Sequence, residues 1–285
     1  MIKFKVVFFY ILLLVLPAFS FGSDFQSPRT AGLGGAGHAT PFLNDAIYLN
    51  PSFISFHPYR GLSFNYLNHF SNPQDPTGQN TFEGNSYNFS ILDGSTDSLF
   101  QAGIGLTKRG DGSIVHIGAS KSITSQLGFG LGTKIIFPVN TADRIFDASF
   151  AFSAIATQWF QASLIIDNLV EARPDLGLFR EFILGTKLNL MSLVAIYVDP
   201  HWVPTITTVP IFGYEGGLEF TVLSDLFLRF GTFTNSFAPF ALTRGNGYSL
   251  GTGFLAPKLS VDYAFTQLSS PMTGFAHQFG MTIFF

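Results

Sequence analysis

The sequence predicts an all-β fold, a transmembrane antiparallel β-barrel of about 14 strands. Three observations point to it. Charged residues make up 12% of the 285 residues, about half the share found in soluble domains. Beyond the first two dozen residues, no apolar run approaches the roughly 18–20 residues that a spanning helix needs. Segments of about nine to twelve residues instead alternate apolar with polar side chains, as strands that cross a bilayer do.

The first residues predict a secretory signal peptide at positions 1–22. Lys3 and Lys5 supply a positively charged start, an apolar run of about eleven residues follows, and Pro17 ends it. This run is too short to span a bilayer and fits the apolar core of a signal. Small residues favour cleavage before Ser23, with cleavage after Ser20 as the alternative. The mature chain is therefore expected to be exported.

Fourteen strand candidates follow Pro58. Their expected ranges are 59–70, 84–92, 98–108, 113–121, 126–137, 145–155, 159–168, 180–190, 192–199, 212–222, 226–234, 247–255, 258–267 and 274–285. The connections between them are expected to alternate between long and short, because outer-membrane barrels have long outer loops and short periplasmic turns. With an even strand number, both ends of the barrel domain are periplasmic.

The two faces of these strands differ in chemistry. In the fifth candidate, Leu127, Phe129 and Leu131 share one face, while Gly128 and Gly130 share the other. We expect the apolar face to meet lipid and the other face to line the lumen. The charged side chains expected to face the lumen are Lys134, Asp147, Asp167, Lys187, Glu215, Glu219, Arg229, Lys258 and Asp262. Their mixed signs favour pairing within a plugged lumen, with a substrate path as the alternative.

The last strand candidate, 274–285, carries a large aromatic and aliphatic face. Phe275, Phe279, Met281, Ile283 and Phe285 alternate with smaller or polar residues, whereas a helix would space its apolar groups by three and four. An unpaired edge of this kind invites aggregation, so we expect it to pair with the first strand. The stretch also resembles the C-terminal signal of bacterial outer-membrane proteins. That resemblance implies that the barrel-assembly machinery is a partner, which would recognise the strand ending at Phe285.

Residues 29–52 carry a second resemblance. Arg-Thr-Ala-Gly-Leu-Gly-Gly-Ala-Gly at 29–37, Asp-Ala at 45–46 and Tyr-Leu-Asn-Pro at 48–51 resemble the start of the FadL-like (OMPP1/TodX) outer-membrane barrels, which include PorV-type barrels. Ser52 departs from the usual Ala or Gly. The resemblance implies a hatch at 23–57 inside a barrel at 58–285. Small residues also permit close packing against strand backbones. The hatch residues it singles out are Gly32, Gly34, Gly35, Gly37, Asn50 and Pro51.

The same resemblance implies a function in the outer membrane: passive uptake of hydrophobic, fatty-acid-like small molecules. Apolar ligands would bind at the outer loops, enter an apolar pocket above the hatch, and leave sideways or downward. Trp202, Phe237 and Phe240 are candidate capture residues, together with Val203, Ile206, Val209 and Leu242. An aromatic belt at the membrane interface is the alternative role for them. The outer loops look short for a ligand groove, which favours a PorV-like docking, secretion-accessory or purely structural barrel as the alternative function.

The sequence contains few motifs that indicate catalysis, metal binding or nucleic-acid binding. There is no cysteine, so disulfides and thiolate sites are excluded. The six histidines lack metal-ligand spacing, and no Gly-x-Ser-x-Gly elbow occurs. The net charge of −3 gives no footprint for nucleic acid. A Gly-x-Gly-x-x-Gly match at 32–37 lacks the βαβ context of a dinucleotide site. We therefore expect no metal, no cofactor and no enzyme, although Ser and His on distant strands leave a barrel enzyme as an alternative.

Overall fold

The computed structural model describes residues 25–71, 84–95, 99–139, 143–174, 177–205, 210–238, 244–271 and 273–285. The predicted signal peptide at 1–22 lies outside the described residues. So do four of the candidate capture residues in the predicted outer loops, namely Ile206, Val209, Phe240 and Leu242.

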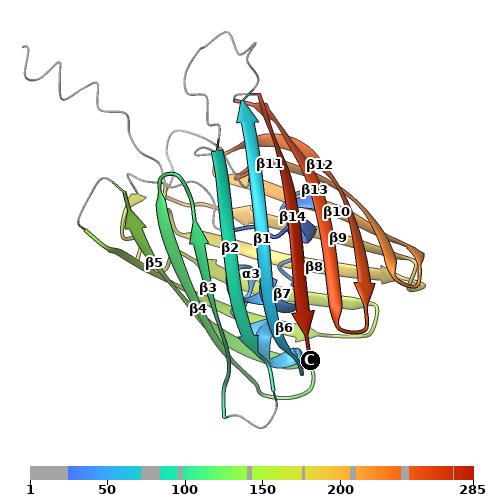
Figure 1. Cartoon of the computed structure of the whole chain (residues 1–285). Coiled ribbons are helices and arrows are strands. Elements are labelled where there is room, and N and C mark those ends of the chain that lie inside the picture. The colour runs from blue at the N-terminus through green and yellow to red at the C-terminus, as the bar shows by residue number, and fades with distance from the viewer. Residues whose placement is uncertain are drawn as a thin grey trace, which may run out of the picture.

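Fourteen strands form the wall of the molecule, as the sequence predicts (Figure 1). Their bounds are β1 (Arg60–Ser71), β2 (Gly84–Asp93), β3 (Gln101–Lys108), β4 (Gly112–Ser122), β5 (Leu127–Pro138), β6 (Ile145–Ile155), β7 (Phe160–Asp167), β8 (Glu181–Leu190), β9 (Val194–Trp202), β10 (Phe212–Leu223), β11 (Leu226–Ser236), β12 (Gly245–Ala256), β13 (Leu259–Ser270) and β14 (Gly274–Phe284).

Every strand pairs antiparallel with its neighbours in the chain, and β14 closes the barrel against β1. The closing register runs from Gly61 opposite Phe284 to Ser71 opposite Gly274. The predicted antiparallel barrel is therefore confirmed. Closure satisfies the backbone groups of both terminal strands and removes the edges that an open sheet would expose.

The outer face of the wall is apolar. In β3, Ile104 and Leu106 are exposed, whereas Gly103 and Gly105 next to them are buried. In β14, Phe279, Met281 and Ile283 are 47%, 39% and 44% exposed. The alternation continues around the barrel, so that water would meet a continuous apolar band. A band of this kind is stable only when lipid tails solvate it.

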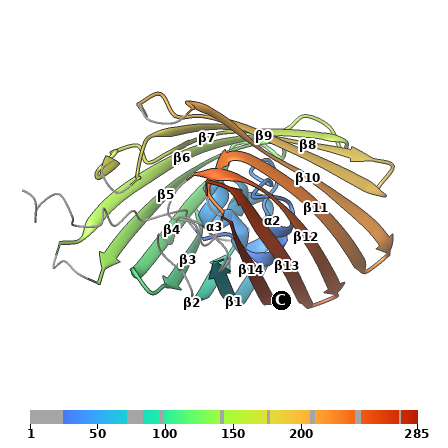
Figure 2. The ribbon, with the colours of Figure 1, turned by 90° about the horizontal axis from the view of Figure 1, so that it is seen from above.

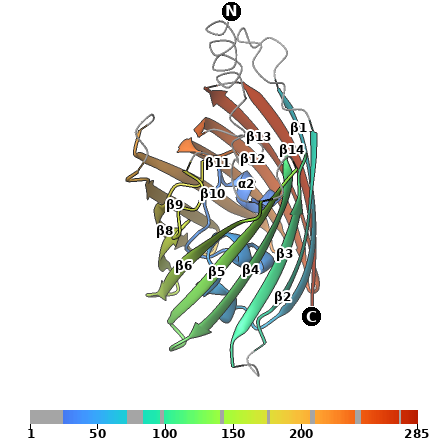
Figure 3. The same ribbon diagram turned by 90° about the vertical axis from the view of Figure 1, so that its left-hand side faces the viewer.

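An N-terminal segment, residues 25–57, lies within the ring of strands (Figures 2 and 3). It contains α2 (Pro28–Gly32), the 3-10 helices η1 (Leu43–Asp45) and η2 (Pro51–Phe56), and α3 (Ala46–Leu49). The first of these contacts β11 to β14, whereas η2 contacts β3 to β6 on the opposite wall. Ser27 and Asn50 start their helices by accepting backbone hydrogen bonds from Thr30 and Ser52. Within the described residues, no helix is long and apolar enough to cross a membrane.

The ninth strand departs from its predicted range at both ends. The sequence places the ninth strand at 192–199, whereas β9 starts at Val194 and continues to Trp202. Met191 and Ser192 have positive φ angles and form the turn instead. The predicted strand ends before Pro200, and proline cannot donate a ladder hydrogen bond. The wall tolerates Pro200 because the pairing of β8 with β9 skips that position, passing from Ile183–His201 to Thr186–Val198.

Candidate functional site

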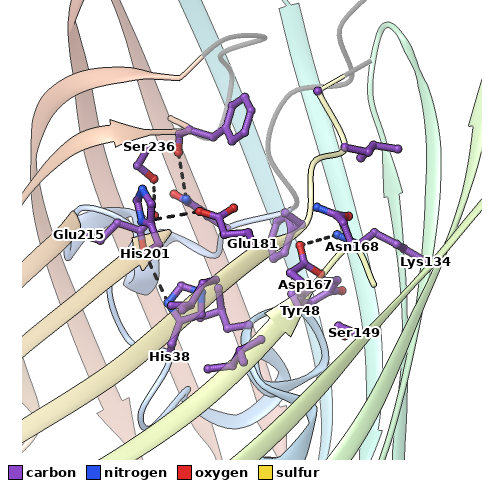
Figure 4. A pocket seen from close by; sticks show the side chains of 18 of the residues that line it. His38, Tyr48, Lys134, Ser149, Asp167, Asn168, Glu181, His201, Glu215 and Ser236 are labelled. Carbon is purple, nitrogen blue, oxygen red and sulfur yellow. Dashed lines mark hydrogen bonds and ion pairs between the residues drawn. The ribbon is translucent and has the colours of Figure 1, made fainter. Parts of the chain in front are cut away.

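A cavity of about 90 Å³ lies between the N-terminal segment and the connections at the outer end of the barrel (Figure 4). The segment contributes Phe25, Gln26, His38, Tyr48 and Leu49 to its lining. The wall and the β7–β8 and β11–β12 connections supply most of the remaining lining residues, which include Lys134, Ser149, Asp167, Asn168, Leu178, Glu181, His201, Glu215, Ser236, Phe237 and Arg244. The cavity is therefore at the place where the sequence leads us to expect a pocket above the N-terminal segment.

The chemistry of the cavity differs from the expected apolar pocket. Charged pairs line it, including Lys134 Nζ with Asp167 Oδ2 at 2.8 Å and Arg244 Nη2 with Glu181 Oε2 at 2.5 Å. Its volume is also below the roughly 150 Å³ of an apolar cavity that holds a benzene ring. The reason is that several inward side chains around the cavity are charged and form ion pairs, Lys134 with Asp167 and Glu181 with Arg244 of the β11–β12 connection. In this conformation the cavity has no room for an apolar ligand.

One cluster of ionisable groups joins the N-terminal segment to the wall. The His38 ring nitrogen Nδ1 lies 2.9 Å from Asp199 Oδ2 on β9 and 3.6 Å from Glu215 Oε2 on β10. The backbone N–H groups of Gly37 and His38 also donate to Asp199 Oδ2, at 2.7 and 2.8 Å. Burial lowers the pKa of His38, but the hydrogen bond and charge of Asp199 outweigh it and raise the pKa to about 9.

A second set of charges, here called the ion chain, links four residues of alternating sign. Arg29 of α2 pairs with Glu219 on β10 at 2.9 Å, and Glu219 pairs with Arg229 on β11 at 2.7 Å. Arg229 continues to Asp262 on β13 at 2.6 Å. Burial of charges is costly unless each is paired and hydrogen-bonded. The alternation satisfies that condition and attaches the N-terminal segment to three strands.

The other predicted lumen-facing charges occupy several environments. Asp147 is fully buried and accepts hydrogen bonds from the backbone of Val170 and Ala172, at 3.0 and 3.2 Å, so it holds the β7–β8 connection. Lys187 is half-buried, with its ammonium 5.3 Å from the Tyr197 ring centre. Lys258 is wrongly predicted to face the lumen. It lies exposed in the turn between β12 and β13, since β13 starts one residue later than expected.

The glycines at the start of the N-terminal segment permit close backbone contact with the wall. Gly34 has a φ of +73°, and a Cβ there would lie 2.6 Å from the Thr232 backbone nitrogen. A Cβ on Gly32 would lie 3.1 Å from Gly251 Cα. Gly35 and Gly37 also have positive φ, which favours glycine. A larger residue at Gly34 would therefore force the segment away from β11.

Asn50 and Pro51 lie against the opposite wall. Asn50 Nδ2 donates to the His38 carbonyl at 2.7 Å and to Ser153 Oγ on β6 at 2.8 Å. Pro51 begins η2, where its missing N–H leaves no helical hydrogen bond unmade. The pair thus starts a helix and connects the two parts of the segment to β6.

The described capture candidates fall on different faces. Trp202 is 41% exposed at the outer end of β9, and its ring stacks with Phe182 and Phe212 on neighbouring strands. Phe237 instead lines the cavity, with the Arg244 guanidinium 4.8 Å from its ring centre. Val203 is fully buried. Trp202 therefore sits where an aromatic belt would lie, whereas Phe237 can contact a molecule inside the barrel.

Sequence reasoning missed several residues that define the site, among them His38, Asp199, His201, Glu181 and Arg244. A signal existed for two of them. Val194, Ile196 and Val198 form an apolar face, and Asp199 and His201 fall on the opposite face of the same strand. Extending the ninth strand past Pro200 would have placed both in the lumen. No such signal exists for His38, because its position depends on how the N-terminal segment folds inside the barrel.

A closed antiparallel barrel with an apolar outer face and a polar interior is the architecture of outer-membrane β-barrel proteins. No protein-family model and no curated protein sequence matches this chain. Solved structures do. The CymD monoaromatic hydrocarbon channel matches with a TM-score of 0.65 at 11% identity, covering 95% of this chain and 99% of that one.

Two further structures show the same likeness. The Pseudomonas putida toluene transporter TodX matches with a TM-score of 0.62 at 11% identity, over 93% of this chain and 98% of TodX. A Pseudomonas aeruginosa FadL homologue matches with a TM-score of 0.61 at 12% identity, over 93% and 99% of the two chains. The predicted resemblance to FadL-like barrels is therefore confirmed at the level of the fold.

Proposed function

We propose that this chain is a bacterial outer-membrane channel for the passive uptake of hydrophobic small molecules. The observation that carries the proposal is the likeness of its fold, over nearly the whole chain, to channels and transporters of toluene and other monoaromatic hydrocarbons. The apolar outer face supports the membrane location. No observation on the described residues specifically favours the docking, secretion-accessory or structural alternatives.

A buried apolar cluster near the outer end supports a hydrophobic cargo. Leu67 on β1, Phe233 on β11, Leu268 on β13 and Ala276 on β14 form one contact cluster with Ala238 of the β11–β12 connection. All five are buried, although many inward positions elsewhere in the lumen, among them Asn65, Asn88 and Gln278, are polar. Apolar side chains inside a polar lumen offer a binding surface that water does not favour. We assign to this cluster the first contact of an apolar molecule within the barrel.

Passage beyond this cluster requires a conformational change. The N-terminal segment occupies the lumen, and the cavity beside it is small and charged. We infer that residues 23–57 act as a hatch within a barrel formed by 58–285, and that the hatch moves when cargo passes. Export by the signal at 1–22 and recognition of the strand ending at Phe285 by the barrel-assembly machinery complete the proposal. N-terminal sequencing of the mature protein should give Ser23 as the first residue.

Uptake can be measured in cells that lack their own hydrocarbon channels. Cells that express this chain should accumulate labelled toluene and labelled oleate several-fold faster than cells with an empty vector. Uptake of a labelled disaccharide should not change, because a filled lumen is no open pore. Faster disaccharide uptake would indicate a porin. No faster uptake of either apolar compound, with the barrel folded in the outer membrane, would contradict the proposed function.

A further inference from the structure

Three buried side chains from distant parts of the chain meet beside the cavity. His38 comes from the N-terminal segment, Asp199 from β9 and Glu215 from β10. One ligand atom from each lies within 4.8 Å of the others. Figure 4 shows His38 and Glu215 along one side of the cavity, with His201 next to Glu215. An imidazole nitrogen and two carboxylate oxygens are a common ligand set for divalent transition metals.

The spacing of the three atoms suits a metal ion. The His38 nitrogen is 2.9 Å from Asp199 Oδ2 and 3.6 Å from Glu215 Oε2. Tetrahedral zinc with bonds of about 2.0–2.1 Å keeps its ligand atoms roughly 3.3 Å apart. Small side-chain rotations would therefore place all three around one ion. Because His38 and Glu215 also line the cavity, the fourth position would face it and be open to water.

Glu215 supplies an independent indication of a cation site. The side chain is 6% exposed, and its Oε2 atom has no hydrogen-bond partner. The other oxygen, Oε1, accepts a hydrogen bond from Ser236 at 2.5 Å, which fixes the orientation of the carboxylate. A buried carboxylate oxygen without a donor is costly. Oε2 points toward His38, where a cation would satisfy it.

The net charge of the surrounding side chains also favours the binding of a cation. Around this point, three carboxylates (Asp199, Glu215 and Glu181) face one guanidinium (Arg244), which leaves two negative charges. His201 contacts Glu181 at 3.8 Å and the Asn235 carbonyl at 3.0 Å. One divalent ion bound between these groups would balance both charges.

Neighbouring groups hold the ligands in place. Asp199 Oδ1 accepts the backbone N–H of Thr186 at 3.1 Å, and its Oδ2 accepts the N–H of Gly37 at 2.7 Å. Such outer contacts orient metal ligands and are part of most metal sites. We propose that His38, Asp199 and Glu215 form a binding site for a divalent transition-metal ion such as Zn²⁺, which ties the N-terminal segment to β9 and β10. The site does not depend on the proposed uptake.

The test uses the full-length mature chain without a histidine tag, purified in detergent and treated with EDTA. Isothermal titration with zinc chloride at pH 7.5 should show one ion bound per chain. Glu215→Gln keeps the oxygen that accepts from Ser236 and removes the anionic ligand. It should weaken zinc binding at least tenfold. Tetrahedral Co²⁺ should give a visible absorption band in the wild type and none in Glu215→Gln.

His277→Ala is the matched control, because His277 lies on the outer side of β14 against Tyr263. It should bind zinc as the wild type does. His38→Ala should lose the site as Glu215→Gln does, and heat-dependent migration on a gel shows that each barrel is folded. No zinc bound to the wild type would overturn the proposal. Equal binding in the wild type and Glu215→Gln would also overturn it, since the ion would then sit on surface histidines.

Discussion

The two halves of the N-terminal segment are attached to opposite walls of the barrel by different kinds of interaction. The first half, residues 27–38, lies against β9 to β14 and is held largely by buried charges, through Arg29 and His38. The second half, residues 43–56, lies against β1 to β6 and is held by neutral hydrogen bonds and close packing. Both halves line the cavity, the first through His38 and the second through Tyr48 and Leu49, and the Glu215 oxygen without a hydrogen bond lies near His38.

The contacts of the second half are short and uncharged. Asn44 Nδ2 donates to Ser90 Oγ at 2.9 Å, and Ser52 Oγ lies 2.7 Å from Ser153 Oγ. Ile54 is fully buried, and a Cβ on Gly118 would lie 2.9 Å from its Cδ1 atom. Contacts of this kind do not depend on pH or on cations, whereas buried charge networks do. We infer that the first half is the movable part of the hatch and the second half its anchor.

The ion chain should give the largest effect of a single substitution. Glu219→Gln removes the anion shared by Arg29 and Arg229 and leaves two buried guanidinium groups close together. Loss of one partner from a buried charge network costs about 3–5 kcal/mol. Guanidinium chloride unfolding in detergent, followed by the fluorescence of the two tryptophans, measures the loss.

The control for that variant is a surface pair. Arg60 and Asp93 lie 3.3 Å apart with side chains 56% and 46% exposed, and such pairs contribute roughly 0–1 kcal/mol. Arg60→Gln should therefore unfold at nearly the wild-type denaturant concentration. Equal losses for Arg60→Gln and Glu219→Gln would show that the ion chain does not attach the first half.

The second largest effect should be a dependence of the unfolding free energy on pH. It comes from Asp45, the one charged residue in the second half. Burial raises the pKa of its carboxyl from 3.8 to about 6, opposed by the hydrogen bond from Ser27. The folded chain thus holds this proton more tightly than the unfolded chain. Its contribution to stability is complete below pH 3.8 and is lost as the pH rises through 6, for a total of about 3 kcal/mol.

Asp45→Asn removes this titration and keeps an oxygen that can accept from Ser27 and Thr30. Between pH 4 and pH 7, the unfolding free energy of the wild type should fall relative to that of the variant. The measurement is denaturant unfolding in the same detergent at several pH values. Parallel curves for the two proteins would mean that Asp45 is not buried beside α2.

A smaller effect should come from close packing in the second half. A methyl group on Gly130 of β5 would collide with the backbone of Ser52, whereas one on Gly216 of β10 finds its nearest atom 3.8 Å away. Gly130→Ala should cost about 1–3 kcal/mol, as overpacking does. Gly216→Ala is the matched control and should be close to neutral. If Gly130→Ala were as stable as the control, the second half would not pack against β5.

The sequence predicts the wall better than the site. Strand number and closure follow from local alternation, as in Leu127 to Phe137 of β5, because lipid outside and a packed lumen inside impose a period of two. Lys134 and Asp167 can be placed in the lumen by parity alone. No local sequence pattern shows that Lys134 pairs with Asp167 or that His38 meets Asp199 and Glu215. These contacts depend on the stagger of the strands and on the path of the N-terminal segment.

The distinction between a movable first half and a fixed second half can be measured directly, since the chain has no cysteine. Ser27 and Ser52 are 7% and 0% exposed, one in each half. Ser27→Cys and Ser52→Cys would each be reacted with a maleimide in detergent, with and without toluene. Toluene should raise the labelling rate of Ser27→Cys at least tenfold and leave Ser52→Cys unreactive. Equal rates at both positions, or no change at Ser27→Cys while toluene is taken up, would contradict the account.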